Sequence, residues 1–205
     1  MKKEYILGNL FFGGLWGISE AVLGDALYSA NVPYASVPLT VIGFVLMAIA
    51  SVYFPQKGTA TLIAGFAMLY KFLNVPFFAC HLLGILLMGV CYDLFFNVLE
   101  IKNRSLSAMA AVYLNYLLFA LMITYVFRYE HWVQGGSVKI LRHVGISGSM
   151  AALTCAIIIP VCLRLNRNIK VRPTTLLNLK TKFIPGSVLV VTIGLWIFSL
   201  VEFIF

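Results

Sequence analysis

The chain alternates between long apolar runs and short polar breaks. Seven runs are close to the length of about 20 residues that crosses a bilayer as a helix; they cover residues 5–24, 36–54, 59–74, 77–98, 107–127, 145–163 and 185–204. The breaks carry proline, glycine, asparagine and charged residues, which are typical of loops. The pattern predicts about seven transmembrane helices, with six as the alternative count.

The same runs favour helices over strands. A strand exposed to lipid leaves backbone amides unpaired, at a cost of several kcal/mol per group, and the strands of a membrane β-barrel alternate polar and apolar residues. These runs do not alternate. Seven spans use about 140 residues and leave roughly 65 for loops. We therefore expect an all-α, polytopic transmembrane helical bundle that forms one domain over residues 1–205.

Composition agrees with a membrane location. The chain is 61% apolar and only 11% charged, whereas soluble domains are nearer a quarter charged. The net charge of +8 comes from basic residues that fall mostly between the apolar runs. That placement is explained by orientation and by anionic lipid rather than by nucleic acid. The expected surroundings are a lipid bilayer, with no nucleic-acid partner.

The basic residues also predict an orientation. With the N-terminus in the cytoplasm, eleven Lys and Arg residues lie inside and four outside, and the break at 164–182 holds six of the eleven. Short cytoplasmic loops carry such an excess. We expect a multi-pass protein of the inner (plasma) membrane, with its N-terminus cytoplasmic and, after seven crossings, its C-terminus outside.

Three ionisable residues lie inside runs at similar depth. Glu20, Lys71 and His81 each lie three or four residues from the outer end of a different run. At 1.5 Å per residue this is about 5–6 Å below the boundary. Asp93 lies near the opposite end. A charge within a span is costly and commonly marks a functional site, so we expect the first three side chains to converge in a pocket that opens outward.

Small residues support that convergence. Gly13, Gly17 and Gly24 share a helical face with Glu20; Ala60, Ala64 and Ala67 share one with Lys71; and Gly84 shares one with His81. Small residues allow helices to approach closely, so these faces are expected to contact protein. The simpler interpretation is a structural Glu20–Lys71 ion pair, with His81 bonded to a backbone carbonyl.

Two outer breaks supply further polar groups. The break at 128–143 carries Arg128, His131, Arg142 and His143, and that at 25–36 carries Tyr28 and Tyr34. We expect the first set to form a lid over the pocket. Because all three histidines fall on this side, a haem or metal site is an alternative. No compact metal-ligand spacing occurs, so metal and cofactor are left unassigned.

Catalytic motifs give no support for an enzyme. The chain has no nucleotide-binding loop, and although Gly145-Ile146-Ser147-Gly148 matches the G-x-S-G of rhomboid proteases, no histidine follows Ser147. A serine without a base is not activated. We expect no enzymatic activity, so uphill transport would require energy from partner subunits or from an ion gradient.

The N-terminal half resembles a known family. Gly13-Gly14-Leu15-Trp16-Gly17-Ile18-Ser19-Glu20-Ala21-Val22-Leu23-Gly24, then Val37-Pro38 to Gly43, then Lys71, resemble the substrate-binding (S) components of energy-coupling factor transporters over residues 8–98. The resemblance implies a compact helical bundle that binds a vitamin or metal near its outer face and docks on membrane and ATPase subunits. Gly13, Gly17 and Ala21 match the family's docking spacing, while a seventh helix departs from its usual six.

These observations favour a membrane subunit that captures a small solute in an outward-facing polar pocket, together with energy-coupling membrane subunits. Its predicted binding residues are Glu20, Lys71, His81, Arg128, His131, Arg142 and His143. The alternatives are a membrane anchor of a respiratory complex that binds haem or quinone through outer histidines, and a purely structural subunit.

Overall fold

The computed structural model describes the backbone of residues 3–74, 79–171 and 177–204, and the side chains over 5–73, 80–166 and 186–201. All regular structure in these ranges is helical. The elements are α1 (Lys3–Ile18), η1 (Ser19–Leu23), α2 (Gly24–Ser29), α3 (Ser36–Tyr53), α4 (Thr59–Asn74), α5 (Ala79–Asp93), η2 (Leu94–Val98), α6 (Arg104–Leu121), η3 (Met122–Val126), α7 (Glu130–Arg142), η4 (His143–Gly148), α8 (Ser149–Val171) and α9 (Leu177–Ile204). The segments η1 to η4 are short π-helices that continue neighbouring α-helices.

The predicted helical bundle is confirmed. Over the described residues each of the seven apolar runs forms a helix or a pair of continuous helices. Five helical stretches are long and apolar enough to cross a membrane, namely Tyr5–Ser29, Ser36–Tyr53, Cys80–Val98, Arg104–Val126 and Glu130–Asn166. Shorter apolar helices cover Thr59–Leu73 and Gly186–Val201. The protein is therefore an all-α bundle with the architecture of a membrane protein.

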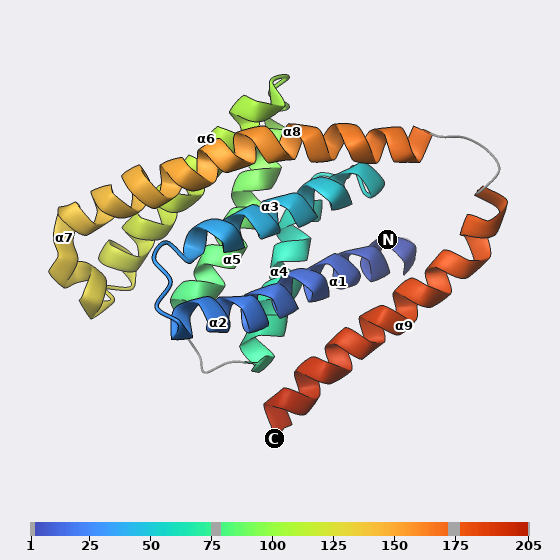
Figure 1. Ribbon diagram of the computed structural model, residues 1–205, viewed down its shortest axis with the longest axis horizontal. Helices are drawn as coiled ribbons and strands as arrows, with labels where there is room; N and C mark the ends of the chain where they lie inside the picture. The colour runs from blue at the N-terminus through green and yellow to red at the C-terminus, as the bar shows by residue number, and fades with distance from the viewer. Residues whose placement is uncertain (1–2, 75–78, 172–176, 205) are drawn as a thin grey trace.

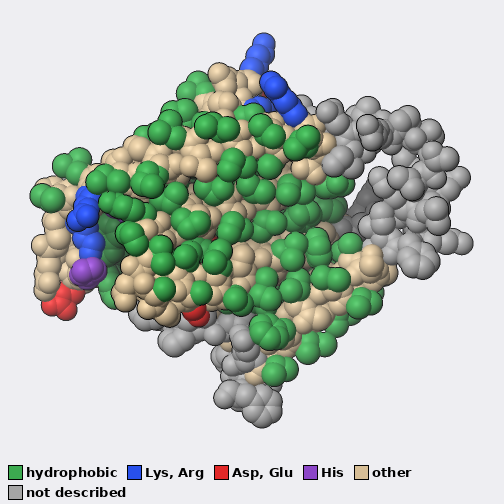
Figure 2. Space-filling view, viewed as in Figure 1, with side chains coloured by type: hydrophobic (Ala, Val, Ile, Leu, Met, Phe, Trp, Pro, Cys, Tyr) green, Lys and Arg blue, Asp and Glu red, His purple; other side chains and the backbone are tan. Residues whose placement is uncertain are grey.

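Six of the long helices form a closed arrangement. α1 packs on α4, α4 on α5, α5 on α6, α6 on α8, α8 on α3, and α3 returns to α1. α9 lies outside this group, where it contacts α1 and α4 (Figure 1). The described part of the face shown in Figure 2 is largely apolar, with Lys and Arg side chains at its edges, as expected for a lipid-facing bundle.

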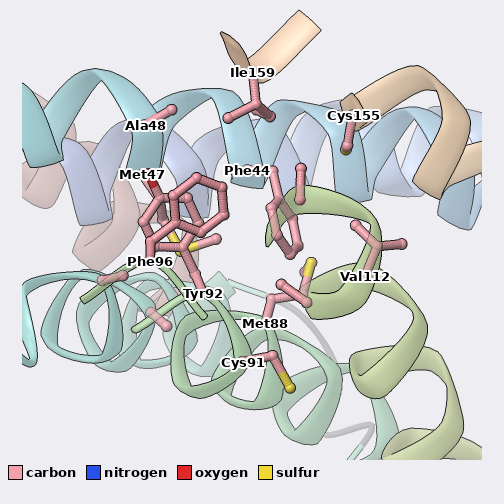
Figure 3. Packing of buried hydrophobic residues seen from close by; sticks show 14 of the residues in the cluster. Phe44, Met47, Ala48, Met88, Cys91, Tyr92, Phe96, Val112, Cys155 and Ile159 are labelled. Atoms are coloured by element: carbon pink, nitrogen blue, oxygen red, sulfur yellow. The ribbon is translucent and has the colours of Figure 1, made fainter. Parts of the chain in front are cut away.

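The centre of the bundle is filled by large side chains set between small ones. Phe44 from α3 packs beside Tyr92, whose ring stacks on Phe96 with centroids 4.3 Å apart (Figure 3). Val112, Cys155 and Ile159 close the same cluster from α6 and α8. Close packing of this kind holds the helices in one arrangement, which positions the polar groups described below.

The small-residue faces predicted from the sequence pack against protein. Gly13 lies on the Phe66 and Ile63 region of α4, and Gly17 lies against Tyr70, with no room for a Cβ atom at either glycine. On the other side of α4, Ala60 and Ala64 meet Gly89 of α5. Because lipid-embedded helices associate through such close contacts, these faces determine how α1, α4 and α5 lie side by side.

Two predicted loops, at 128–143 and 164–182, are mostly helical over the described residues, and a third, at 25–36, is helical at its start, so those predictions were wrong in these parts. The break at 25–36 begins with α2, the break at 128–143 contains α7, and α8 continues to Val171 within the predicted loop 164–182. The segment 128–143 carries no proline and is broken only at Gly136, whose φ is 54°. Polar, charged residues without a proline continue a helix as readily as they form a loop, so polarity alone misplaced these boundaries.

Asp93 has a structural role at the end of the bundle opposite Glu20. Its carboxylate accepts hydrogen bonds from the Thr61 amide at 2.7 Å and the Thr61 hydroxyl at 2.6 Å, and its other oxygen accepts one from Asn97 at 2.6 Å. Thr61 lies in the first turn of α4. A carboxylate there satisfies an otherwise unpaired amide and interacts favourably with the helix dipole. The burial of this charge is therefore explained without a ligand.

Candidate functional site

Glu20 and Lys71 meet between α1 and α4, as predicted. The Lys71 ammonium donates a hydrogen bond of 2.8 Å to the Glu20 backbone carbonyl, and it lies 3.9 Å from Glu20 Oε2. The side chains are only 4% and 7% exposed. Trp16 donates from Nε1 to Glu20 Oε1 at 3.2 Å. The carboxylate is thus held from two sides, by a cation and by an indole.

Local helix geometry places the Glu20 side chain. Glu20 lies in η1, the π-helical stretch that interrupts the first membrane helix. A π-helical turn changes the direction of side chains relative to an α-helix and is frequent at functional sites. Because Gly17 has no side chain, Tyr70 of α4 packs directly against its backbone. The end of α4 therefore lies close enough to η1 for Lys71 to reach Glu20. The glycine face and the π-helix together create this contact.

A cavity of about 90 Å³ lies beside this pair. It is bounded by η1 and α2, by the first turns of α3 and α5, by the second half of α6, and by η4, toward the α2 end of the bundle in Figure 1. The lining residues are Glu20, Tyr28, Ser36, Leu39, Thr40, Cys80, His81, Gly84, Ile85, Met88, Asn115, Tyr116, Phe119 and His143. The cavity therefore collects polar groups from five parts of the chain at the predicted depth.

Hydrogen bonds fix part of this lining. The Tyr116 hydroxyl lies 3.2 Å from the Thr40 hydroxyl and donates to Ser36 Oγ at 3.5 Å. Tyr116 also packs against the His143 ring, with centroids 4.8 Å apart. These contacts join α3, α6 and η4 on one side of the cavity, so the aromatic and hydroxyl groups there have defined positions.

The opposite side is built from α2 and α5. The Tyr28 ring stacks on the His81 imidazole with centroids 5.1 Å apart and an interplanar angle of 20°. Glu20 lines the cavity near this stack, whereas Lys71 does not line it. Among the described residues that line the cavity, Glu20 is the only carboxylate, and none is a lysine or arginine. The cavity is therefore lined by a carboxylate and by aromatic side chains. Lys71, which pairs with that carboxylate, lies outside the lining.

Asn115 is the least satisfied group in the lining. It is 6% exposed, and its Oδ1 has no hydrogen-bond partner within the described residues. A buried acceptor left unpaired costs about 1–3 kcal/mol. Asn115 lies on the second half of α6 and lines the cavity. Asn115 is thus a lining residue whose amide has hydrogen-bonding capacity that the described residues leave unused.

The predicted site residues divide into three groups. Glu20, His81 and His143 line the cavity, and Lys71 lies directly behind Glu20. The predicted lid is only partly present: His131 and Arg142 are exposed on α7, and Arg128 borders a separate groove with Thr124 and Glu130. The structure thus brings four of the seven together. The lid was misplaced because α7 carries these side chains away on a surface helix.

Sequence inspection missed several lining residues. Thr40, Asn115 and Tyr116 lie within apolar runs and carry no charge, so a search for ionisable residues passed over them. Asn115 was the one that could have been found, since an amide in the middle of the 107–127 run needs a hydrogen-bond partner in a bilayer.

The haem alternative is not favoured by the cavity. His81 and His143 both line it, but its volume of about 90 Å³ is below the roughly 150 Å³ that accepts benzene in an engineered cavity. A porphyrin therefore does not fit between these imidazoles in this conformation. Among the described residues, no group of three His, Cys, Asp or Glu side chains is placed to hold a metal ion.

The comparisons with known proteins found no match. No family model, no curated protein and no solved structure matches this chain. The functional argument therefore rests on the residues and geometry of the cavity.

Proposed function

We propose that this protein is a solute-binding subunit of a membrane transport system, and that the cavity beside Glu20 is its binding site. The observation that carries the proposal is a cavity lined by hydroxyl, imidazole and carboxylate groups and by Asn115, whose buried Oδ1 has no hydrogen-bond partner among the described residues. Ligand sites typically combine apolar and aromatic walls with a few polar groups that fix orientation. This cavity has both.

The charges indicate which solute it takes. A negatively charged solute would meet the Glu20 carboxylate, and none of the described lining residues is a lysine or arginine. Asn115 Oδ1 and the Glu20 carboxylate are both acceptors, and the carboxylate favours a partner with positive charge or hydrogen-bond donors. The proposed solute is therefore small, carries no negative charge and donates hydrogen bonds, as amines, amidines, amides and ureas do.

The transport role extends the binding role. The sequence contains no nucleotide-binding loop, so energy for uphill movement would come from other membrane subunits or from an ion gradient. The excess of basic residues at the opposite end supports a cytoplasmic location for that end in a plasma membrane, and in that orientation the cavity would open outward. This arrangement is the one implied by the resemblance to S components.

A thermal-unfolding screen tests the proposal. Purified protein is heated with solutes of similar size, which are amines, amides and ureas in one set and carboxylates and phosphates in the other. We expect a member of the first set to raise Tm. At 100 times its Kd a ligand adds about 2.7 kcal/mol, or roughly 5–10 °C for a chain of this size.

Two variants link any shift to the cavity. Asn115→Leu removes the unpaired acceptor without leaving a new unpaired group, so it should fold and lose the ligand-induced shift. Thr154→Val is the control, since the Thr154 hydroxyl donates to the Met150 carbonyl within α8 and Thr154 is not among the lining residues. A shift that survives in Asn115→Leu would place the binding elsewhere, and no shift with any solute would count against the proposed function.

A further inference from the structure

A second hollow lies at the Asp93 end of the bundle, between the start of α6 and the end of the membrane-spanning part of α8. Its lining residues are Lys102, Asn103, Arg104, Ser105, Pro160, Leu163 and Arg164. Among these described residues three are cations and none is a carboxylate. We name this hollow the basic groove. Figure 2 shows Lys and Arg side chains gathered at the top edge, where Figure 1 draws the start of α6.

The charges of the basic groove are not balanced by the described part of the protein. The nearby carboxylate, Glu100, pairs with Lys57 at 3.7 Å. Arg104 contacts the Phe96 ring and carbonyl, and none of the three groove cations has a carboxylate partner within 4.0 Å among the described residues. Three cations around one hollow repel each other unless an anion lies between them.

The groove also lies where a membrane lipid has its headgroup. Arg104 begins the span Arg104–Val126, and Arg164 is two residues from the end of the span Glu130–Asn166. Pro160 and Leu163 give the groove an apolar floor. Leu106, Val161 and Leu165 are each at least half exposed beside it, which provides a surface for acyl chains. The amino end of α6 adds a partial positive charge at the same point.

We infer that the basic groove binds the phosphate headgroup of an anionic phospholipid. Its three cations would contact the phosphate, and the exposed leucine and valine side chains would pack along the first part of the acyl chains. Basic pockets between helices on the cytoplasmic side recognise anionic headgroups in this way. The groove lies at the end of the bundle opposite the cavity, so this inference does not depend on the proposed solute.

Native mass spectrometry of the full chain tests the lipid site. The protein in detergent is titrated with phosphatidylglycerol and, separately, with phosphatidylcholine of the same acyl chains. We expect preferential retention of one phosphatidylglycerol molecule. Lys102→Ala and Arg164→Ala should each lower that retention about fivefold, the factor typical of one basic residue at an anionic headgroup.

Arg142→Ala is the control, because it removes one exposed positive charge outside the groove without releasing a carboxylate beside it. Its lipid retention should equal that of the wild type. Equal retention of the two lipids, or an equal loss in Arg142→Ala, would overturn the groove as a specific site. Displacement of phosphatidylglycerol by an equal concentration of inorganic phosphate would show that free phosphate is the ligand and would overturn the lipid assignment.

Discussion

Lys71→Met should destabilise the protein by about 3–5 kcal/mol, which corresponds to a Tm lower by roughly 10 °C. The substitution keeps most of the side-chain volume but removes the cation that contacts the Glu20 carbonyl and carboxylate. Glu20 is then a buried carboxylate whose remaining donor is Trp16. Breaking a buried pair by removing one partner is costly because it leaves an uncompensated charge.

The double variant shows whether the two groups are coupled. Glu20→Gln with Lys71→Met leaves no buried charge at the site, so its stability should recover most of the loss. Lys57→Met is the matched control, since the Lys57–Glu100 pair is about two-thirds exposed and should change stability by less than about 1 kcal/mol. Unfolding of Glu20→Gln, Lys71→Met, the double variant and Lys57→Met in one detergent gives the comparison, and additive effects of the two single substitutions would show that Glu20 and Lys71 do not interact.

Gly89→Ala should cost about 3 kcal/mol, or roughly 6–12 °C in Tm. A Cβ atom at this position would lie 2.4 Å from the Cβ of Ala64, 2.7 Å from the Ala60 carbonyl oxygen and 3.0 Å from the Thr61 Cα. Two of these atoms belong to the backbone of α4, which cannot rotate away as a long side chain can. The α4–α5 contact must therefore widen. The hydrogen bond from the Thr61 amide to Asp93 crosses this contact, so it is weakened as well.

Gly65→Ala is the control for that substitution. Gly65 lies in the same α4 helix, and a Cβ atom there would meet nothing within 4 Å in the described structure. The same chemical change should leave stability unchanged or raise it slightly, because alanine favours a helix over glycine by up to about 1 kcal/mol. If both variants unfold at the same temperature, the close approach of α4 and α5 at Gly89 is not a source of stability.

The sequence was a good guide to the fold because a bilayer leaves few options. Each apolar run had to satisfy its backbone internally, and each became a helix. The Glu20–Lys71 contact was predictable for a related reason: two charges at one depth, each on a face of small residues, had to meet inside protein. Neither prediction depended on the conformation of the loops.

The rest of the site depended on local geometry that residue types do not encode. The π-helices η1 and η4 place Glu20 and His143 at the cavity, and no pattern in the sequence marks where a helix widens. The prediction of a lid was wrong for His131 and Arg142 because both lie on the helix α7, where their side chains are exposed on the surface. Asn115 was overlooked because it carries no charge, although its unpaired oxygen is the clearest feature of the cavity.

The central claim is that the cavity beside Glu20 holds a small solute, and mass spectrometry of protein extracted gently from native membranes tests it most directly. The wild type and Thr154→Val should each release the same small molecule, a hydrogen-bond donor without negative charge, in an amount close to one per chain. Asn115→Leu should release little or none. A wild-type protein that is folded and carries no small molecule, or an acidic molecule retained equally by Asn115→Leu, would contradict the account.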